Sequence, residues 1–141
     1  MPNPDIPLLV YGKYHWFTGY VGRVLSQTAW SDLSRAQIII LGGIYSGETR
    51  AIRLAEMTGV SRQAISKTVK ELQNRGLLTQ QADIEKGNSS VLMLTEDGQA
   101  CVDTVNAQVD ILMAKLKARF GGAAVKHAMA VLSADWSEFL E

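Results

Sequence analysis

The sequence has little of what several functional classes require. Its single cysteine, Cys101, excludes an internal disulfide framework and suits a reducing compartment. The two histidines, His15 and His127, lie far from each other and from that cysteine, so we expect no metal site. No apolar run approaches the roughly 20 residues that cross a bilayer, and the N-terminal segment lacks the basic start and apolar stretch of a secretory signal. We therefore expect a cytoplasmic protein with no membrane span, metal or cofactor.

Signatures of catalysis are also scarce. Gly42, Gly43 and Gly47 do not form a phosphate loop, because no Gly-Lys-Ser/Thr sequence follows them. No spacing typical of a nucleophile, a base and an acid stands out along the chain. The sequence therefore does not support an enzyme.

The composition is that of an ordinary globular protein, with 47% apolar and 20% charged residues among 141. This length predicts one domain, residues 1–141. The formal net charge is zero, but residues 50–90 contain seven bases against four acids, a net charge of +3, whereas residues 91–141 have a net charge of −3. A basic centre of this kind can attract a polyanion even when the whole molecule is neutral.

Hydrophobic periodicity and capping residues predict a mainly α-helical chain with one small β-hairpin. Ser34 and Gln37 can cap the start of one helix reciprocally, and Gly59 and Gly76 follow two others as C-terminal glycines. The predicted helices cover residues 8–30, 35–45, 52–58, 61–75 and 95–120, with an extended piece at 49–51 and strands at 77–81 and 90–94. A last helix after Gly121-Gly122 is expected to present Val125, Met129, Leu132, Trp136 and Leu140 on one face.

The N-terminal helix is apolar on more than one face, although it lies at a chain end. A helix of this kind must be buried on two sides, so we expect a second subunit to cover one of them. Aromatic side chains in and near this helix have two possible roles. They form either the dimer core, which we favour, or a pocket for a small effector. The residues that could line such a pocket are Tyr11, Tyr14, His15, Trp16, Tyr20, Trp30 and Tyr45, of which we single out His15, Trp16, Tyr20 and Tyr45 as the effector contacts.

Residues 52–78 predict a helix-turn-helix, since two helices are joined by the short turn Thr58-Gly59-Val60. On the second helix Ile65, Val69 and Leu72 follow the i, i+4, i+7 spacing of a core-facing side. The opposite and N-terminal positions are polar or basic: Ser61, Arg62, Gln63, Ser66, Lys67 and Lys70. Such side chains donate hydrogen bonds to phosphates and purine edges, although any amphipathic surface helix has a polar outer face. The hairpin that follows at once favours a DNA-binding winged helix over an ordinary helical pair.

Several short motifs, in this order and at these distances, resemble the multiple-antibiotic-resistance regulator (MarR) family. They are Leu33-Ser34-Arg35-Ala36-Gln37, Leu54-Ala55-Glu56 with Gly59-Val60-Ser61-Arg62, Val69-Lys70-Glu71-Leu72, Arg75-Gly76-Leu77-Leu78, and Leu94-Thr95-Glu96-Asp97-Gly98. The resemblance extends over roughly the whole chain and is most specific over residues 33–98. It implies a winged helix-turn-helix at about 34–94 and a homodimer formed by helices at about 8–30 and 99–140.

The wing departs from the pattern that this family usually shows. Family members commonly have an Asp-x-Arg element there, with the arginine reaching into the minor groove. Asp83 is present, but the tip reads Lys86-Gly87-Asn88 and the loop contains no arginine. Lys86 can still contact phosphate and Asn88 a minor-groove acceptor, so both are candidates for DNA contact.

The resemblance and the polar helix together predict a transcriptional regulator that binds a pseudopalindromic operator in double-stranded DNA. The resemblance implies a repressor or, less often, an activator. The resemblance also implies that a small aromatic or phenolic effector releases the regulator from DNA. The alternative is a winged helix that binds another protein and has no DNA function. Cys101 is interpreted as a small buried hydrophobe, with a redox sensor as the less favoured reading.

Overall fold

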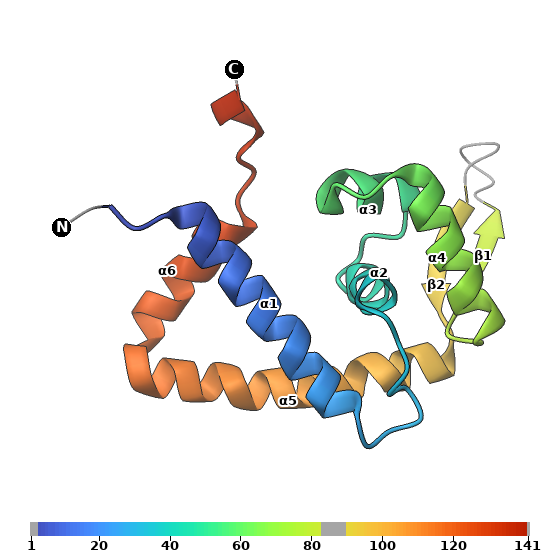
Figure 1. Cartoon of the computed structure of the whole chain (residues 1–141), viewed down its shortest axis with the longest axis horizontal. Coiled ribbons are helices and arrows are strands. Elements are labelled where there is room, and N and C mark those ends of the chain that lie inside the picture. Colours follow the sequence, from blue (N-terminus) through green and yellow to red (C-terminus); the bar gives the residue numbers. More distant parts are fainter. Residues whose placement is uncertain (1–2, 83–89, 141) are drawn as a thin grey trace. The chain divides into compact units, whose positions relative to one another are not determined.

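The computed structural model describes residues 3–82 and 90–140 (Figure 1). In chain order the elements are α1 (Ile6–Leu25), α2 (Arg35–Tyr45), α3 (Ala51–Thr58), α4 (Arg62–Asn74), β1 (Leu78–Ala82), β2 (Ser90–Leu94), α5 (Glu96–Phe120), α6 (Gly122–Ser133) and the short 3₁₀ helix η1 (Ser137–Leu140). The predicted fold class, mainly α with a small hairpin, is confirmed. The chain divides into two compact units, Met1–Val105 and Asn106–Glu141, and α5 continues from the first into the second.

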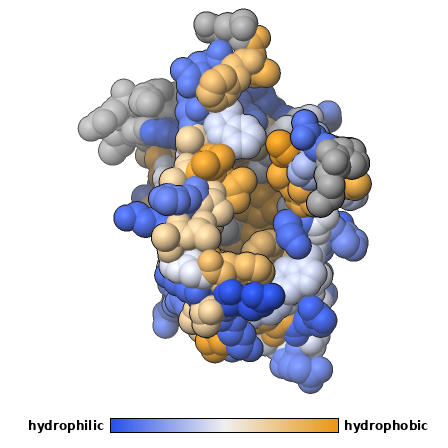
Figure 2. Space-filling model, turned by 90° about the vertical axis from the view of Figure 1, so that its left-hand side faces the viewer, coloured by the Kyte–Doolittle hydropathy of each residue, from blue (hydrophilic) through white to orange (hydrophobic). Residues whose placement is uncertain are grey.

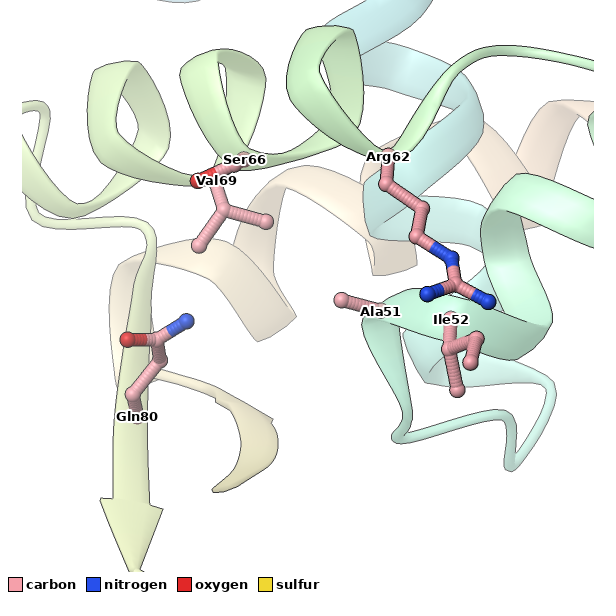
Figure 3. Close-up of a pocket in the computed structure, with 6 residues that line it drawn as sticks. All are labelled: Ala51, Ile52, Arg62, Ser66, Val69 and Gln80. Atoms are coloured by element: carbon pink, nitrogen blue, oxygen red, sulfur yellow. The ribbon is translucent and has the colours of Figure 1, made fainter. Parts of the chain in front are cut away.

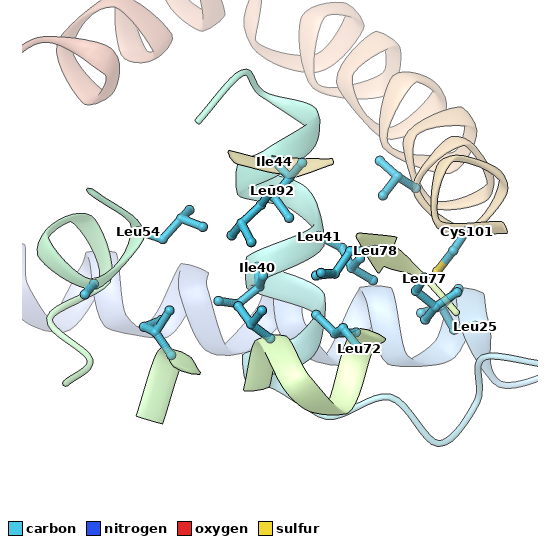
Figure 4. Close-up of a cluster of buried hydrophobic side chains, with 14 residues drawn as sticks. Leu25, Ile40, Leu41, Ile44, Leu54, Leu72, Leu77, Leu78, Leu92 and Cys101 are labelled. Carbon is cyan, nitrogen blue, oxygen red and sulfur yellow. The ribbon is translucent and has the colours of Figure 1, made fainter. Parts of the chain in front are cut away.

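The core of the first unit lies where α2, α3, α4 and the hairpin pack together (Figure 4). Its most completely buried side chains are aliphatic, with Leu72 of α4 and Leu92 of β2 both 0% exposed. Ile40 and Leu41 contribute the inner side of α2. Burial of these branched side chains fixes which side of α4 faces inward.

Helix α2 begins as its capping residues predict. The Gln37 amide donates to Ser34 Oγ at 3.2 Å, and the Ser34 amide donates to Gln37 Oε1 at 2.9 Å. These two bonds satisfy backbone donors that have no partner inside the helix. Within the helix a side chain at Gly43 would overlap Leu54 of α3, which explains this glycine, whereas the space beside Gly42 is open.

Two left-handed glycines end the helices of the helix-turn-helix. Gly59 has φ +69° and lets the chain turn sharply from α3 into α4. Gly76 has φ +72° and ends α4, where the Leu77 amide donates to the Leu72 carbonyl and the Gly76 amide to the Gln73 carbonyl. This is the Schellman arrangement, and it turns the chain directly into the hairpin.

The hairpin is antiparallel, with Leu78 opposite Leu94 and Ala82 opposite Ser90. Strand β1 starts one residue later than predicted because the Leu77 amide belongs to the cap of α4. The extended piece predicted at 49–51 is not a strand in the structure. One backbone hydrogen bond links it to the hairpin, from the Leu92 amide to the Thr49 carbonyl at 2.8 Å. Helix α3 already begins at Ala51.

Two predicted helix ends were wrong. Helix α1 stops at Leu25 rather than at residue 30. Directly after Leu25, the hydroxyls of Ser26 and Thr28 donate to carbonyls of the last turn of the helix at 2.7 Å each. Helix α6 stops at Ser133, so Trp136 and Leu140 do not share its face. Asp135 accepts hydrogen bonds from the amide and hydroxyl of Ser137, a local pairing that competes with a continuing helix.

Large apolar side chains remain exposed in both units. On α1 they include Ile6, Leu8, Leu9, Val10 and Tyr11, and in the second unit Met129, Val131, Leu132 and Phe139. Figure 2 shows one face of the molecule on which hydrophobic side chains lie at the surface among polar ones. Covering of these side chains by a second subunit stays a prediction. In the described part of the chain no helix combines the length and hydrophobicity that a membrane span requires.

Candidate nucleic-acid interface

Helix α4 is held by its inner face. Ile65, Val69 and Leu72 are 3%, 1% and 0% exposed, so the predicted core-facing spacing is confirmed. Thr68 is also buried, and its hydroxyl donates to the Ala64 carbonyl at 3.0 Å. Because this side is fixed in the core, the opposite side of α4 has to face outward.

The first turn of α4 is capped by Ser61. Its Oγ accepts a hydrogen bond from the Ala64 amide at 3.1 Å, as expected for an N-cap. The hydroxyl proton of Ser61 is not used in this bond. Ser61 can therefore cap the helix and still donate to an external acceptor such as a phosphate oxygen.

An open, shallow hollow follows the outer side of α4, and residues of this helix line it. We call this hollow the outer groove. The structure brings four of the predicted residues together in it: Gln63, Ser66, Lys67 and Lys70. Glu71 and Asn74 line the same groove and were not among the predicted site residues. Their spacing of four residues from Lys67 and Lys70 was the available signal, since such pairs are neighbours on a helix.

Glu71 is the acidic residue among those that line the outer groove. Its Oε2 accepts a hydrogen bond from Gln37 Nε2 at 3.0 Å, which links α4 to the first turn of α2. One carboxylate beside two ammonium groups leaves a net positive charge along this part of α4. A surface of this chemistry suits phosphate oxygens and the hydrogen-bonding edges of bases.

Arg62 faces a different depression, the inter-element pocket between α3, α4 and β1 (Figure 3). This pocket has a volume of about 210 Å³ and is lined by Ala51, Ile52, Arg62, Ser66, Val69 and Gln80. Ser66 therefore borders both depressions. The sequence placed Arg62 with the two lysines, whereas the fold divides these cations between two sides of α4.

The predicted wing contacts, Lys86 and Asn88, lie outside the described residues. Strand β1 is described to Ala82, and β2 from Ser90. Their part in DNA binding stays a prediction.

None of the four candidate effector residues lines the outer groove or the inter-element pocket. Trp16 and Tyr20 stack with ring centroids 5.3 Å apart and an interplanar angle of 12°. Trp16 and Tyr45 are both nearly half exposed. A separate apolar pocket of about 190 Å³ lies between α1 and α2. Its lining comprises Tyr14, Phe17, Thr18, Val21, Arg35, Ile38 and Ile39. It includes Tyr14 of the wider aromatic set, but none of the four residues singled out as effector contacts.

Cys101 lies in the core and is 2% exposed. Burial raises the pKa of its thiol to about 11, and the positive charge of Arg75 lowers this pKa only in part. The thiol is therefore neutral at physiological pH, which fits the interpretation as a small buried hydrophobe. Among the described residues no group of three or more histidine, cysteine, aspartate or glutamate side chains is placed to hold a metal ion.

Comparison with known proteins agrees with the helix-turn-helix and hairpin described above. A sequence model of the MarR family matches residues 31–87, which include α2, α3, α4 and β1. No curated protein matches the chain. The resemblance to this family is thus confirmed over residues 31–87.

Solved structures with the same fold cover almost the whole chain. The transcriptional regulator PA4135 has a TM-score of 0.72 at 16% identity and covers 92% of this chain and 94% of its own. A MarR-family regulator from Rhodococcus sp. RHA1 has a TM-score of 0.69 at 22% identity, covering 91% and 89%. A mutant of MepR from S. aureus, bound to an oligodeoxyribonucleotide, has a TM-score of 0.60 at 16% identity, covering 93% and 95%. At these identities the likeness supports the winged-helix fold.

Proposed function

Because residues 31–87 match the MarR family in sequence, we propose that this chain is a transcriptional regulator that binds duplex DNA. The observation that supports this most directly is the outer side of α4. Its inner face is fixed in the core, and Gln63, Ser66, Lys67 and Lys70 line one outward groove. Helix α4 is the second helix of the helix-turn-helix, the one that enters the major groove in proteins of this architecture.

The groove residues divide by chemistry. Lys67 and Lys70 donate to phosphates as point charges, and Ser61 at the N-cap adds a further donor. Gln63 can pair with adenine through two hydrogen bonds, and Ser66 can bond to either base type. In the wing, Lys86 contacts phosphate and Asn88 a minor-groove acceptor. That the structurally similar MepR mutant has been solved bound to an oligodeoxyribonucleotide supports DNA as the partner.

The functional unit in this proposal is a homodimer in the cytoplasm, assembled through the regions at 8–30 and 99–140. Exposed apolar side chains on α1 and in the second unit support this assembly, because water contact with so much apolar surface is unfavourable. Two copies of α4 then meet half-sites about one DNA turn, roughly 34–36 Å, apart. A pseudopalindromic operator follows from the two-fold symmetry.

The proposed regulatory mode is repression that a small aromatic or phenolic effector relieves. His15, Trp16, Tyr20 and Tyr45 remain the proposed contacts, and the nearby apolar pocket between α1 and α2 offers a second location with Arg35 at its edge. An effector that binds one dimer geometry better changes the separation of the two α4 helices. A thermal-shift screen of phenolic and aromatic acids tests for such a ligand.

DNA binding is tested by fluorescence anisotropy with fragments of the source genome and with a mixed-sequence duplex, at several salt concentrations. We expect Lys67→Ala to weaken binding to every sequence and to reduce the salt slope by about 1.8, because the homodimer loses one phosphate contact of about 0.9 in each subunit. The matched control is Arg53→Ala, at an exposed cation on α3 that lines neither depression and lies outside the proposed dimer regions, because it removes the same net charge. Equal losses in the two variants would refute a specific role for Lys67.

Base discrimination is tested separately with Gln63→Ala on a fragment selected for tight binding. We expect a relaxed preference at one base position, with affinity for the mixed-sequence duplex retained. If the unmodified protein binds no duplex even at low salt, the DNA-binding proposal fails and the protein-binding winged helix becomes the better account.

A further inference from the structure

The inter-element pocket combines polar donors from two consecutive elements of the chain. Arg62 and Ser66 come from α4, and Gln80 comes from β1 (Figure 3). The apolar part of the lining consists of Ala51 and Ile52 at the start of α3 and Val69 of α4. The pocket is therefore a partly apolar hollow with a guanidinium, a hydroxyl and a carboxamide around it.

The position of Gln80 follows from strand alternation. Leu78, two residues earlier, is 2% exposed and faces the core, so Gln80 lies on the same side of β1. Gln80 therefore lies on the side of β1 that packs against α4. The neighbouring Gln81 is exposed and belongs to the opposite side of the strand.

The chemistry of the lining matches a sugar–phosphate unit. Among the described residues that line the pocket, Arg62 is the charged one and none is acidic. Guanidinium, hydroxyl and carboxamide groups all donate hydrogen bonds to phosphate oxygens. A volume of about 210 Å³ exceeds the roughly 30 Å³ share of one water molecule, and the apolar wall suits the carbons of a deoxyribose.

The location also fits, because the pocket adjoins the outer groove. Ser66 lies on the ridge between them, since it lines both. A helix that enters the major groove has base edges along its exposed side and the sugar–phosphate backbones beside it. The side of α4 next to the hairpin is thus where one backbone would pass.

We propose that the inter-element pocket binds one phosphodiester of the DNA backbone, with Arg62 and Gln80 as its two principal donors. This inference rests on the proposed DNA-binding function and adds a strand residue, Gln80, to the interface. It also assigns Arg62 to the backbone and not to a guanine base. Sequence readout is then left to the outer groove, where Gln63 lies.

The test measures the affinity of the full-length protein for a mixed-sequence duplex and for a selected genomic fragment. Gln80→Glu places a negative charge beside the bound phosphate, and we expect it to weaken both complexes about tenfold more than its control. The control is Gln81→Glu, which adds the same charge one residue away on the other side of β1. Arg62→Gln is expected to weaken both duplexes equally and to lower the salt slope by about 1.8, since both subunits of the homodimer lose the contact.

The outcomes separate the two proposals. If the unmodified protein binds neither duplex, DNA binding itself fails and the phosphate pocket with it. If it binds, but Gln80→Glu and Gln81→Glu lose equal affinity, the pocket is not a phosphate site. If Arg62→Gln weakens only the selected fragment, Arg62 reads a base and the assignment is overturned. Far-ultraviolet circular dichroism and thermal melting of each variant establish that these exposed substitutions leave the fold intact.

Discussion

Gly98 should be among the least replaceable residues of the first unit. It is buried in the first turn of α5, and its amide donates to Thr95 Oγ1 at 3.0 Å. Thr95 in turn donates from its hydroxyl to the Gly76 carbonyl at 2.6 Å and from its amide to the Leu77 carbonyl at 3.1 Å. A Cβ added at Gly98 would overlap the Leu77 carbonyl oxygen and lie 3.0 Å from its carbon. The obstacle is backbone, which cannot rotate aside as a side chain can.

The size of the effect follows from three contributions. Overpacking typically costs about 1–3 kcal/mol. Displacing the Leu77 carbonyl weakens its bond from the Thr95 amide, worth about 0.5–1.5 kcal/mol. In the opposite direction, alanine in place of glycine stabilises a helix by about 1 kcal/mol. We therefore expect Gly98→Ala to lower the free energy of unfolding by about 2 kcal/mol.

The assay is urea unfolding followed by circular dichroism, at one protein concentration for all variants because a dimer's stability depends on concentration. The control is Gly42→Ala in α2, where the space around the added Cβ is open. We expect this variant to gain up to about 1 kcal/mol. A Gly98→Ala protein as stable as the unmodified chain, or changed by the same amount as the control, would refute the argument.

Three further predictions concern the same unit. Leu72→Ala, at a side chain that is 0% exposed, should lower the free energy of unfolding by about 2–5 kcal/mol in the urea assay. The side-chain hydrogen bond from Arg75 to Asp32, 2.7 Å long, lowers the pKa of Asp32, so its contribution to stability is present at neutral pH and is lost as pH falls through the lowered pKa. Asp32→Asn should accordingly reduce the loss of stability on the acid side, and an unchanged pH profile would contradict this. With its pKa raised to about 11, the Cys101 thiol should react with a disulfide reagent at neutral pH only as fast as the protein opens, and rapid labelling of the folded state would contradict its burial.

Local signals in the sequence were sufficient for most helix and strand positions. The reciprocal cap of Ser34 and Gln37 and the glycine ends at Gly59 and Gly76 depend on contacts within a few residues, so they could be read directly. The end of α1 at Leu25 was missed because helical periodicity identifies a helix but does not show at which residue it ends. There the hydroxyls of Ser26 and Thr28 bond to the backbone within turns, which periodicity does not detect.

The sequence predicted which side of α4 is buried, but not how the polar residues of its other sides are arranged. The spacing of Ile65, Val69 and Leu72 determined which side of α4 is buried, because a helix presents residues four and seven apart on one face. Because these three residues face the core, the same spacing also predicted which side of α4 is polar and exposed. The pairing of Glu71 with Gln37 was not predictable in the same way, since the two lie 34 positions apart in sequence.

What the sequence alone determined is therefore the order of helices and strands, the inward side of α4 and the basic character of its outward side, all of which depend on short-range spacing. The tertiary structure was needed to show that Arg62 and Gln80 line one pocket whereas Lys67 and Lys70 line another groove. The reason is physical: the hairpin packs against one side of α4, and the packing of distant segments, unlike helical periodicity, depends on contacts that no local pattern encodes.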